Sequence, residues 1–159
     1  MLRKNVKIPN WKNARQIIKR VGSKIKLLVL LEKAKKEYDE TQFAECKNTC
    51  LNALENNPDN PVALRGLGCV EMSLGNYKNA ISYFEKALKN STKKEIEFTL
   101  IGSVYYLEDS FDKAIEYYNK AIDINDNYDE AHDWKNQSIL ERHLKIADLQ
   151  DNLIKRHLF

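Results

Sequence analysis

A cysteine pair comes first among the residues that could carry out chemistry. Cys46 and Cys50 lie four residues apart, so both thiols fall on one face of a predicted helix. A tetrahedral metal site needs four ligands, and no second Cys/His pair stands at ligand spacing from these thiols. Small thiols at such positions more often pack in the protein interior. We therefore predict that both cysteines are buried packing residues.

The three histidines, His132, His143 and His157, all lie near the C-terminal end. Asp129 and Asp133 share a helical face with His132, so a divalent metal ion is one interpretation. The other is that the two aspartates stabilise a helix N-terminus through its dipole. His143 lies 11 residues beyond His132, about 16 Å along a helix, which is too far to share an ion. We favour the dipole interpretation and predict no metal site.

The motifs of common catalytic sites are absent from the sequence. It contains no glycine-rich phosphate loop, no nucleophile elbow and no Cys-x-x-Cys pair. We therefore predict that the protein is not an enzyme, has no catalytic residues, binds no cofactor and takes no small-molecule substrate. The alternative to catalysis is binding, which depends on the elements that shape the protein surface.

Small and aromatic residues recur along the chain with a period of 34 residues, as from Gly68 to Gly102 and from Phe84 to Tyr118. Self-similarity at this period is typical of stacked helix pairs. Small side chains let the two helices of a pair approach closely, while aromatic rings fill the space beside them. The small positions hold Ala34, Gly68 and Gly102; Cys46, Ala80 and Ala114; and Ala53, Ala87 and Ala121.

At these positions the sequence resembles the tetratricopeptide repeat (TPR) family. The resemblance implies an all-α fold, an antiparallel helix-pair solenoid of about three repeats followed by a C-terminal capping helix. The repeats are expected at residues 27–60, 61–94 and 95–128. Gly75 is expected in the turn between two helices, where a positive φ is tolerated at little cost.

The first repeat departs from the family pattern. Lys33, Glu37 and Lys47 fall where apolar residues are usual. Shifting the first helix of this repeat by one residue would place Leu31, Ala34 and Tyr38 in the packing positions instead. The sequence leaves both registers open.

Residues 129–159 begin like a fourth repeat but lack the signature of its second helix. An apolar stripe continues to the end with charged residues between its members, so we predict a capping helix that covers the third repeat. A coiled-coil homo-oligomer through this helix is the alternative, although its heptads are not sustained. The stripe consists of Trp134, Leu140, Leu144, Ala147, Ile154 and Leu158.

Residues 1–26 carry nine Lys/Arg and no acidic residue, whereas the rest of the chain has a net charge of −6. We predict a tail over residues 1–9, a helix from Trp11, and a break at Gly22–Ser23 where Ser23 could cap the next helix. We favour a solvated tail followed by a packing helix. A basic arm for nucleic acid or anionic lipid, and a mitochondrial-type targeting peptide, are the alternatives.

Length and composition place further bounds on the protein. No apolar run in the 159 residues approaches the roughly 20 residues that a membrane span needs, and a secretory signal is not expected. An odd number of cysteines in a chain of this size indicates a reducing compartment. We therefore predict a cytoplasmic protein.

Helical geometry predicts which surface a partner would contact. In the first helix of each repeat, the second, fifth, ninth and twelfth positions share one face, opposite the packing positions. The TPR resemblance implies that this face lines a concave groove for an extended peptide or a helix. We therefore predict a noncatalytic scaffold that binds a protein or peptide there. The predicted partner-binding residues are Lys35, Tyr38, Val62, Arg65, Cys69, Met72, Ile96, Thr99, Ser103 and Tyr106, with Glu130, Asp133 and Gln137 toward the cap.

Some members of the TPR family hold the C-terminal carboxylate of a chaperone with a set of Lys, Asn and Arg residues. This sequence departs from that pattern, so a cochaperone of that kind is disfavoured. The corresponding positions hold Leu31, Lys35, Gly66, Ile96 and Leu100.

Two alternatives to an external protein partner in the groove stay open. Residues 1–26 could bind nucleic acid or an anionic membrane, in which case binding would depend steeply on salt. Residues 11–21 could instead fill the protein's own groove as an amphipathic helix, with their cations attracted to the acidic cap.

Overall fold

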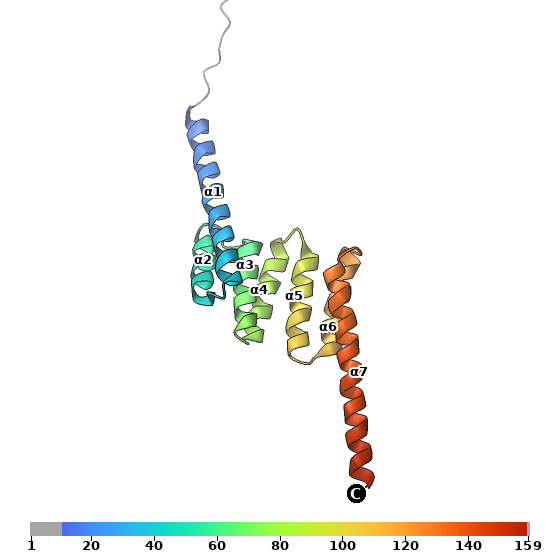
Figure 1. Cartoon of the computed structure of the whole chain (residues 1–159). Coiled ribbons are helices and arrows are strands. Elements are labelled where there is room, and N and C mark those ends of the chain that lie inside the picture. The colour runs from blue at the N-terminus through green and yellow to red at the C-terminus, as the bar shows by residue number, and fades with distance from the viewer. Residues whose placement is uncertain (1–10, 159) are drawn as a thin grey trace, which may run out of the picture.

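The computed structural model describes residues 11–158, with side chains described for residues 19–154 other than Asn56. Seven α-helices and no strand make up this part of the chain, which confirms the predicted all-α fold (Figure 1). The helices are α1 (Trp11–Asp39), α2 (Phe43–Asn56), α3 (Pro61–Ser73), α4 (Tyr77–Asn90), α5 (Lys94–Leu107), α6 (Phe111–Ile124) and α7 (Asp129–Leu158).

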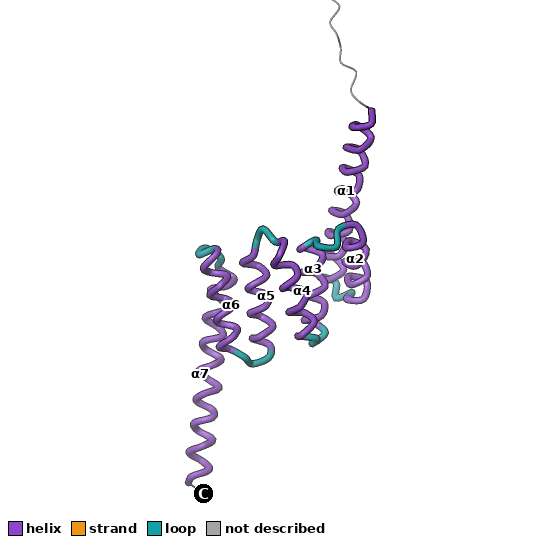
Figure 2. Tube along the Cα trace, turned by 180° about the vertical axis from the view of Figure 1, so that it is seen from behind, coloured by secondary structure: helices purple, strands orange, loops and turns teal. Residues whose placement is uncertain are grey.

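Consecutive helices pack as antiparallel pairs, α1 with α2, α3 with α4 and α5 with α6, and the pairs stack in a row. Helix α7 packs on α6 and α5 at the end of the row. Figure 2 shows the same row from behind, with short loops joining the helices. This is the predicted helix-pair solenoid.

Three turns at 34-residue spacing share one backbone geometry. Thr41, Gly75 and Asp109 have positive φ angles of 60°, 75° and 56°. The amide after each of them donates to the carbonyl five positions earlier, as in a Schellman motif that ends a helix. These bonds join Gln42 N to Glu37 O (2.8 Å), Asn76 N to Glu71 O (2.8 Å) and Ser110 N to Tyr105 O (2.9 Å).

Burial in the first repeat agrees with this spacing. Glu37 is 8% exposed, as expected for the unshifted register, whereas the burial of Ala34 (5% exposed) fits both registers. The burial of Glu37 and the shared turn geometry together favour the unshifted register. Ion pairs explain why charged residues stand at these positions. Lys33 Nζ lies 3.4 Å from Glu37, and Lys47 Nζ lies 2.7 Å from the buried carboxylate of Glu71. The hydrogen bond from Lys47 holds the pKa of Glu71 below its usual range.

Glycines allow the first and second helices of a repeat to touch. A Cβ atom at Gly68 would collide with the ring of Phe84, and one at Gly102 would lie 2.6 Å from a ring carbon of Tyr118. Both rings are fully buried. The predicted role of small residues in close helix packing is therefore confirmed at these positions.

Helix α1 does not break at Gly22–Ser23, and the predicted break is wrong. The helix runs without interruption from Trp11 to Asp39, because most residues on both sides of Gly22 favour helix and one interior glycine costs only about 1 kcal/mol. The predicted boundary at residue 26 therefore falls inside one helix. The predicted tail, residues 1–9, lies outside the described residues, and the helix predicted from Trp11 is confirmed.

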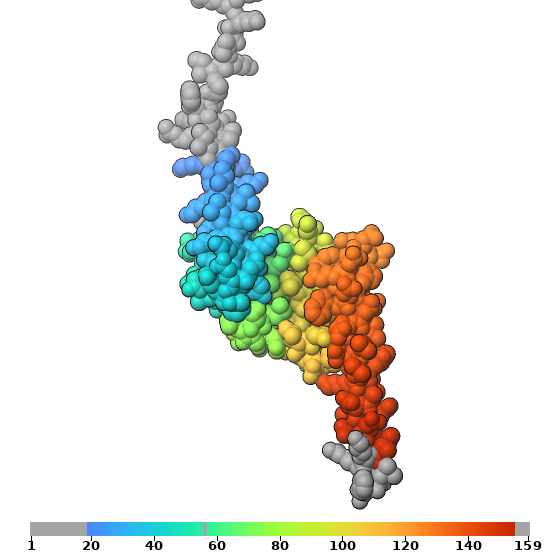
Figure 3. Space-filling model, in the orientation of Figure 1, coloured from blue at the N-terminus to red at the C-terminus, as the bar shows by residue number. Residues whose placement is uncertain are grey.

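Each of the two longest helices packs along only part of its length. Figure 3 shows α1 projecting from one side of the helix row and α7 from the opposite side. In α7, Ala131 and Ser138 are fully buried, whereas Leu149 and Ile154 are 59% and 58% exposed. None of the described helices has the length and apolar character needed to cross a membrane.

Candidate functional site

One surface of the solenoid is built from the first helix of each pair together with α7. Contacts join these four helices in order. Tyr38 on α1 hydrogen-bonds Ser73 on α3 (3.0 Å between the hydroxyl oxygens), and the rings of Tyr106 on α5 and Trp134 on α7 lie 5.4 Å apart. We call the surface of α1, α3, α5 and α7 the A-face. Every predicted partner-binding residue belongs to these helices.

A cavity of about 290 Å³ opens between α1 and α3 on the A-face. It exists partly because Gly66 has no side chain, since a Cβ there would lie only 2.7 Å from the Cys50 sulfur. Half of the predicted partner-binding residues line it, so the structure brings them together. The lining consists of Leu31, Glu32, Ala34, Lys35, Tyr38, Cys46, Cys50, Val62, Arg65, Gly66 and Cys69.

All three cysteines contribute to the wall of this cavity. Cys46 and Cys50 are each 1% exposed, which confirms that they are buried packing residues. Burial raises the pKa of the Cys50 thiol to about 12 and that of Cys69 to about 11. The thiols are therefore neutral at physiological pH, and the interior of the cavity is apolar. Charge is confined to its rim, at Glu32, Lys35 and Arg65.

Arg65 is held in place by a carboxylate that was not among the predicted site residues. Glu97 on α5 is fully buried, and its Oε1 accepts hydrogen bonds from Arg65 Nε (2.9 Å) and Nη2 (2.5 Å). Its second oxygen has no hydrogen-bond partner. Glu97 occupies the position that holds Ala63 in the preceding repeat, so a charged residue at a small-residue position was the available signal. Arg65 thus links α3 to α5 while leaving 23% of its side chain exposed.

The predicted surface needs one correction on α5. Thr99 is 2% exposed, and its hydroxyl donates to the Glu95 carbonyl (2.9 Å), so this residue faces the interior. Ile96, Ser103 and Tyr106 are half-buried, as is Met72 on α3. The prediction for Thr99 was wrong because the adjoining helices cover the predicted face of α5 at this residue.

The C-terminal half of the A-face is acidic. Glu130 and Asp133 on α7 are exposed, and Glu95 on α5 is half-buried. The Tyr128 hydroxyl donates to Glu130 (2.6 Å), and burial raises the pKa of this tyrosine above its usual range. Residues 95–134 contain eleven acidic and two basic residues, a net charge of −9, which is shared among α5, α6 and the start of α7. On the A-face itself, Glu95, Glu130 and Asp133 supply the negative charge. This charge favours a basic ligand on that half of the face.

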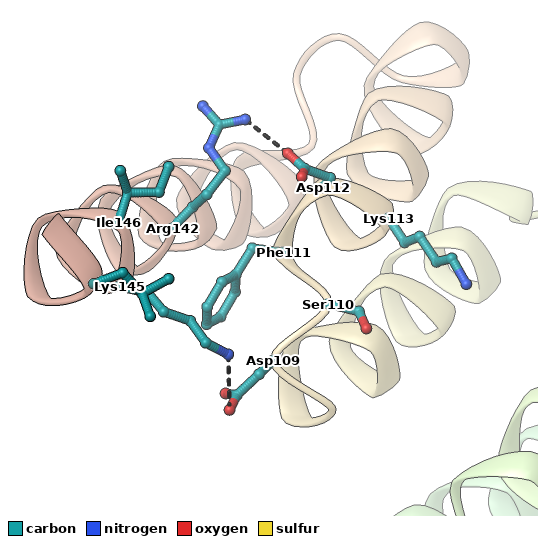
Figure 4. A pocket seen from close by; sticks show the side chains of 9 residues that line it. Asp109, Ser110, Phe111, Asp112, Lys113, Arg142, Lys145 and Ile146 are labelled. Carbon is teal, nitrogen blue, oxygen red and sulfur yellow. Dashed lines mark hydrogen bonds and ion pairs between the residues drawn. The ribbon is translucent and has the colours of Figure 1, made fainter. Parts of the chain in front are cut away.

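A second notch, of about 380 Å³, lies where α7 leaves the helix row (Figure 4). The ring of Phe111 lies between two ion pairs, from Arg142 to Asp112 (2.9 Å) and from Lys145 to Asp109 (3.3 Å). These pairs use the charges at the rim of the notch to fasten α7 to the start of α6. The notch lies outside the predicted site.

The residues considered for a metal site do not gather around a common point. His132 uses a ring nitrogen in a 2.9 Å contact with the Asp126 carbonyl oxygen. Within the part of the chain that the structure describes, no group of three His, Cys, Asp or Glu side chains could hold a metal ion.

The A-face is not filled by residues 11–21. This segment continues α1 as a straight helix away from the other helices, so the self-occupied alternative is wrong for this structure (Figure 1). A continuous helix cannot fold back onto its own side. The apolar cavity between α1 and α3 therefore stays open.

Family models place the repeats in a known class. Residues 61–93 match one tetratricopeptide repeat model, and residues 97–131 match another. The chain is a tetratricopeptide repeat protein. Each match corresponds to one helix pair, and the second extends into the start of α7. No curated protein sequence matches this TPR chain.

Solved TPR structures share this fold at low sequence identity. An O-GlcNAc transferase mutant from Thermobaculum terrenum has a TM-score of 0.68 at 20% identity over 74% of this chain, which spans only 22% of the transferase. The first TPR of Spaghetti (RPAP3), bound to an HSP90 peptide, has a TM-score of 0.64 at 19% identity over 72% of this chain and 91% of its own. The TPR domain of Sgt2 from Aspergillus fumigatus has a TM-score of 0.66 at 18% identity, covering 77% and 81% of the two chains. These likenesses concern the fold.

Proposed function

We propose that this TPR protein is a noncatalytic interaction scaffold whose A-face binds an extended peptide or a helix of a partner protein. The observation that carries the proposal is the open apolar cavity between α1 and α3. Its volume of about 290 Å³ suits one large apolar side chain of a partner. Lys35 at the rim could pair with an acidic residue beside that anchor. A related fold holding an HSP90 peptide supports a peptide partner in general terms.

Three repeats contribute to this scaffold in our assignment. We assign the first to residues 27–60, the second to 61–94 and the third to 95–128, with residues 129–159 as the capping helix. The shared turn geometry at Thr41, Gly75 and Asp109 supports this division. It gives the first repeat the same architecture as the two that match the family models.

Binding accounts for the A-face better than catalysis does. The cavity presents thiols whose pKa values are raised by burial, and a protonated thiol is a poor nucleophile. Arg65 acts on the Cys69 thiol, but burial raises the pKa of this thiol by more than the arginine lowers it. We place this scaffold in the cytoplasm, because all three cysteines are free, as in a reducing compartment.

A peptide-display experiment tests the proposal. A library of random peptides is selected on the full-length protein, and the affinity of an enriched peptide is measured by isothermal titration calorimetry. We expect enriched peptides to contain a large apolar residue. The variant Lys35→Glu/Val62→Lys should weaken binding at least tenfold, because it places charge in the cavity mouth and reverses the rim charge. A tenfold loss corresponds to about 1.4 kcal/mol.

A matched variant on the second helices of the first two repeats, with Leu51 on α2 and Lys89 on α4, controls for charge and apolar loss. Leu51→Lys/Lys89→Glu makes the same types of change, and Leu51 is as exposed as Val62, at 44% against 46%. This control should keep the affinity within about twofold, a change of about 0.4 kcal/mol. Equal losses in both variants, or a selection that enriches no peptide, would count against the A-face as the binding surface. Arg65 is left unchanged because it also pairs with buried Glu97.

A further inference from the structure

The free part of α1, residues 11–26, projects beyond the helix row, and we call it the N-terminal overhang (Figure 1). Its described side chains, those of residues 19–26, are all exposed. An apolar stripe begins there and continues along α1. The stripe has i, i+4, i+7, i+8 spacing, which places its members on one helical face. It consists of Val21 (51% exposed), Ile25 (56%), Leu28 (56%) and Val29 (62%).

The overhang is also strongly basic. Residues 11–26 include six Lys/Arg and no acidic residue. Four of these cations have described side chains, and all four are exposed: Lys19, Arg20, Lys24 and Lys26. An exposed apolar stripe bordered by cations fits an acidic surface that also offers apolar side chains.

The C-terminal half of the A-face has that complementary character. Ile96 and Tyr106 supply apolar surface on α5, and exposed Glu130 and Asp133 supply negative charge on α7. The wider segment 95–134 carries a net charge of −9, part of which lies on α6 outside the A-face. No other segment of comparable length in this chain has so large a negative charge.

An overhang cannot reach the acidic half of its own molecule. Helix α1 is continuous and points away from the row, and α7 stands at the opposite end of the row (Figure 1). Each molecule therefore presents a basic amphipathic helix at one end and an acidic face at the other. Only a second copy could bring the two surfaces together.

We infer that the N-terminal overhang of one copy docks on the acidic half of the A-face of a second copy. Val21 and Ile25 face Ile96 and Tyr106, while the overhang cations lie near Asp133. The arrangement is head-to-tail, so it leaves a free overhang and a free acidic face at the ends of every assembly. The inference rests on the proposed function, because both use the A-face. It leaves the cavity between α1 and α3 for another partner.

Sedimentation equilibrium of the full-length protein tests the inference first. We expect the average mass to rise with protein concentration beyond that of a dimer, because a head-to-tail contact does not close on itself. Raising NaCl from about 0.05 to 0.5 M should weaken association, since exposed charges are screened. A protein that stays monomeric at all concentrations and at low salt would overturn the inference.

Two double variants separate the two surfaces. Val21→Asp/Ile25→Asp disables the overhang, and Asp133→Lys/Gln137→Lys disables the acidic face. Each variant alone should be monomeric. Mixed together, they should form a one-to-one heterodimer and nothing larger, because one variant still has an intact face and the other an intact overhang. A mixture that stays monomeric would overturn the head-to-tail arrangement.

Two matched control variants carry the same kinds of substitution at surfaces outside the docking contact. Asp123→Lys/Asn127→Lys makes the same charge change outside the A-face and should assemble like wild type. Ile146→Asp/Leu149→Asp removes exposed apolar surface from α7 beside the notch at Phe111 and should also assemble. Loss of association only in this last variant would favour a dimer through α7 and overturn the inference. Circular dichroism melting checks that each variant folds.

Two further outcomes distinguish this inference from competing ones. A monomeric wild type that binds phosphatidylserine vesicles or RNA through Lys19, Arg20 and Lys24 would assign the overhang to those ligands instead. A monomeric wild type that still binds a display-selected peptide in a Lys35- and Val62-dependent manner would overturn the head-to-tail contact alone. The proposed function would then stand.

Discussion

At the scale of single residues, charged side chains inside the helix row decide which changes the protein tolerates. Arg65 looks from the sequence like a free groove cation, and the structure shows that it also neutralises buried Glu97. The sequence pattern could place Arg65 on the A-face, because helical periodicity fixes the face. It could not reveal the partner, because the two residues lie 32 positions apart on different helices.

Replacing Arg65 with alanine should destabilise the protein by about 3–5 kcal/mol, because Glu97 would stay buried without a counter-charge. Urea unfolding followed by circular dichroism measures the change. The double variant Arg65→Met/Glu97→Met should recover most of the loss, since it removes both charges and keeps similar volume. Lys35→Ala, at an exposed position of the same surface, should change stability by less than about 0.5 kcal/mol. An Arg65→Ala variant as stable as Lys35→Ala would contradict this role for Arg65.

At the scale of elements, the 34-residue period predicted the helix pairs and their packing, since Ala80, Ala87, Ala114 and Ala121 are all fully buried. The same period did not predict that Thr41 takes a positive φ. The glycine at position 75 predicts such a turn by its residue type alone. A β-branched residue such as Thr41 takes a positive φ only at an energetic cost, so the sequence gives no signal of the turn there. The break expected at Gly22 was wrong for the opposite reason. Gly22 does not favour a turn strongly enough to end the helix.

Two glycine-to-alanine changes should therefore shift stability in opposite directions. Gly68→Ala should cost about 1–3 kcal/mol, because the new Cβ would collide with the Phe84 ring. Gly22→Ala should raise helix content, with a gain of about 0.5–1 kcal/mol for α1, because no atom lies within 4 Å of the new Cβ. Thermal melting and the far-ultraviolet circular dichroism signal measure both effects. A gain at Gly68, or a loss of helix at Gly22, would contradict the packing or the continuity of α1.

At the scale of the whole molecule, the sequence predicted the solenoid but not its two projecting helices. Periodicity indicates which residues of a helix could pack, but it does not indicate how far along that helix the neighbouring helices extend. Ile25, in the predicted packing helix, and Ile154, in the predicted stripe of the capping helix, therefore looked like ordinary core-facing positions, although both residues are more than half exposed. Only the arrangement of α1 and α7 on opposite sides of the row shows that these stripes lack a cover within one chain (Figure 3).

Deleting residues 61–94 removes one full period and should bring α5 directly against the first repeat. Glu97 would then face Leu31, which stands where Arg65 does in the second repeat. We expect Leu31→Arg to stabilise the deletion protein, by about 3 kcal/mol or more, because it restores a counter-charge for the buried carboxylate. Urea unfolding of the deletion protein with and without Leu31→Arg measures this difference. No gain from the arginine would mean that Glu97 escapes to solvent in the shortened array.

The two ion pairs between repeats allow only one order of the repeats in the array. Lys47 and Glu71 join the first repeat to the second, whereas Arg65 and Glu97 join the second to the third. The apolar packing positions are similar enough to be exchanged between repeats, but the charged ones are not. A shuffled array would leave Glu97 buried without its arginine, so each helix pair can recognise its proper neighbour while the chain folds.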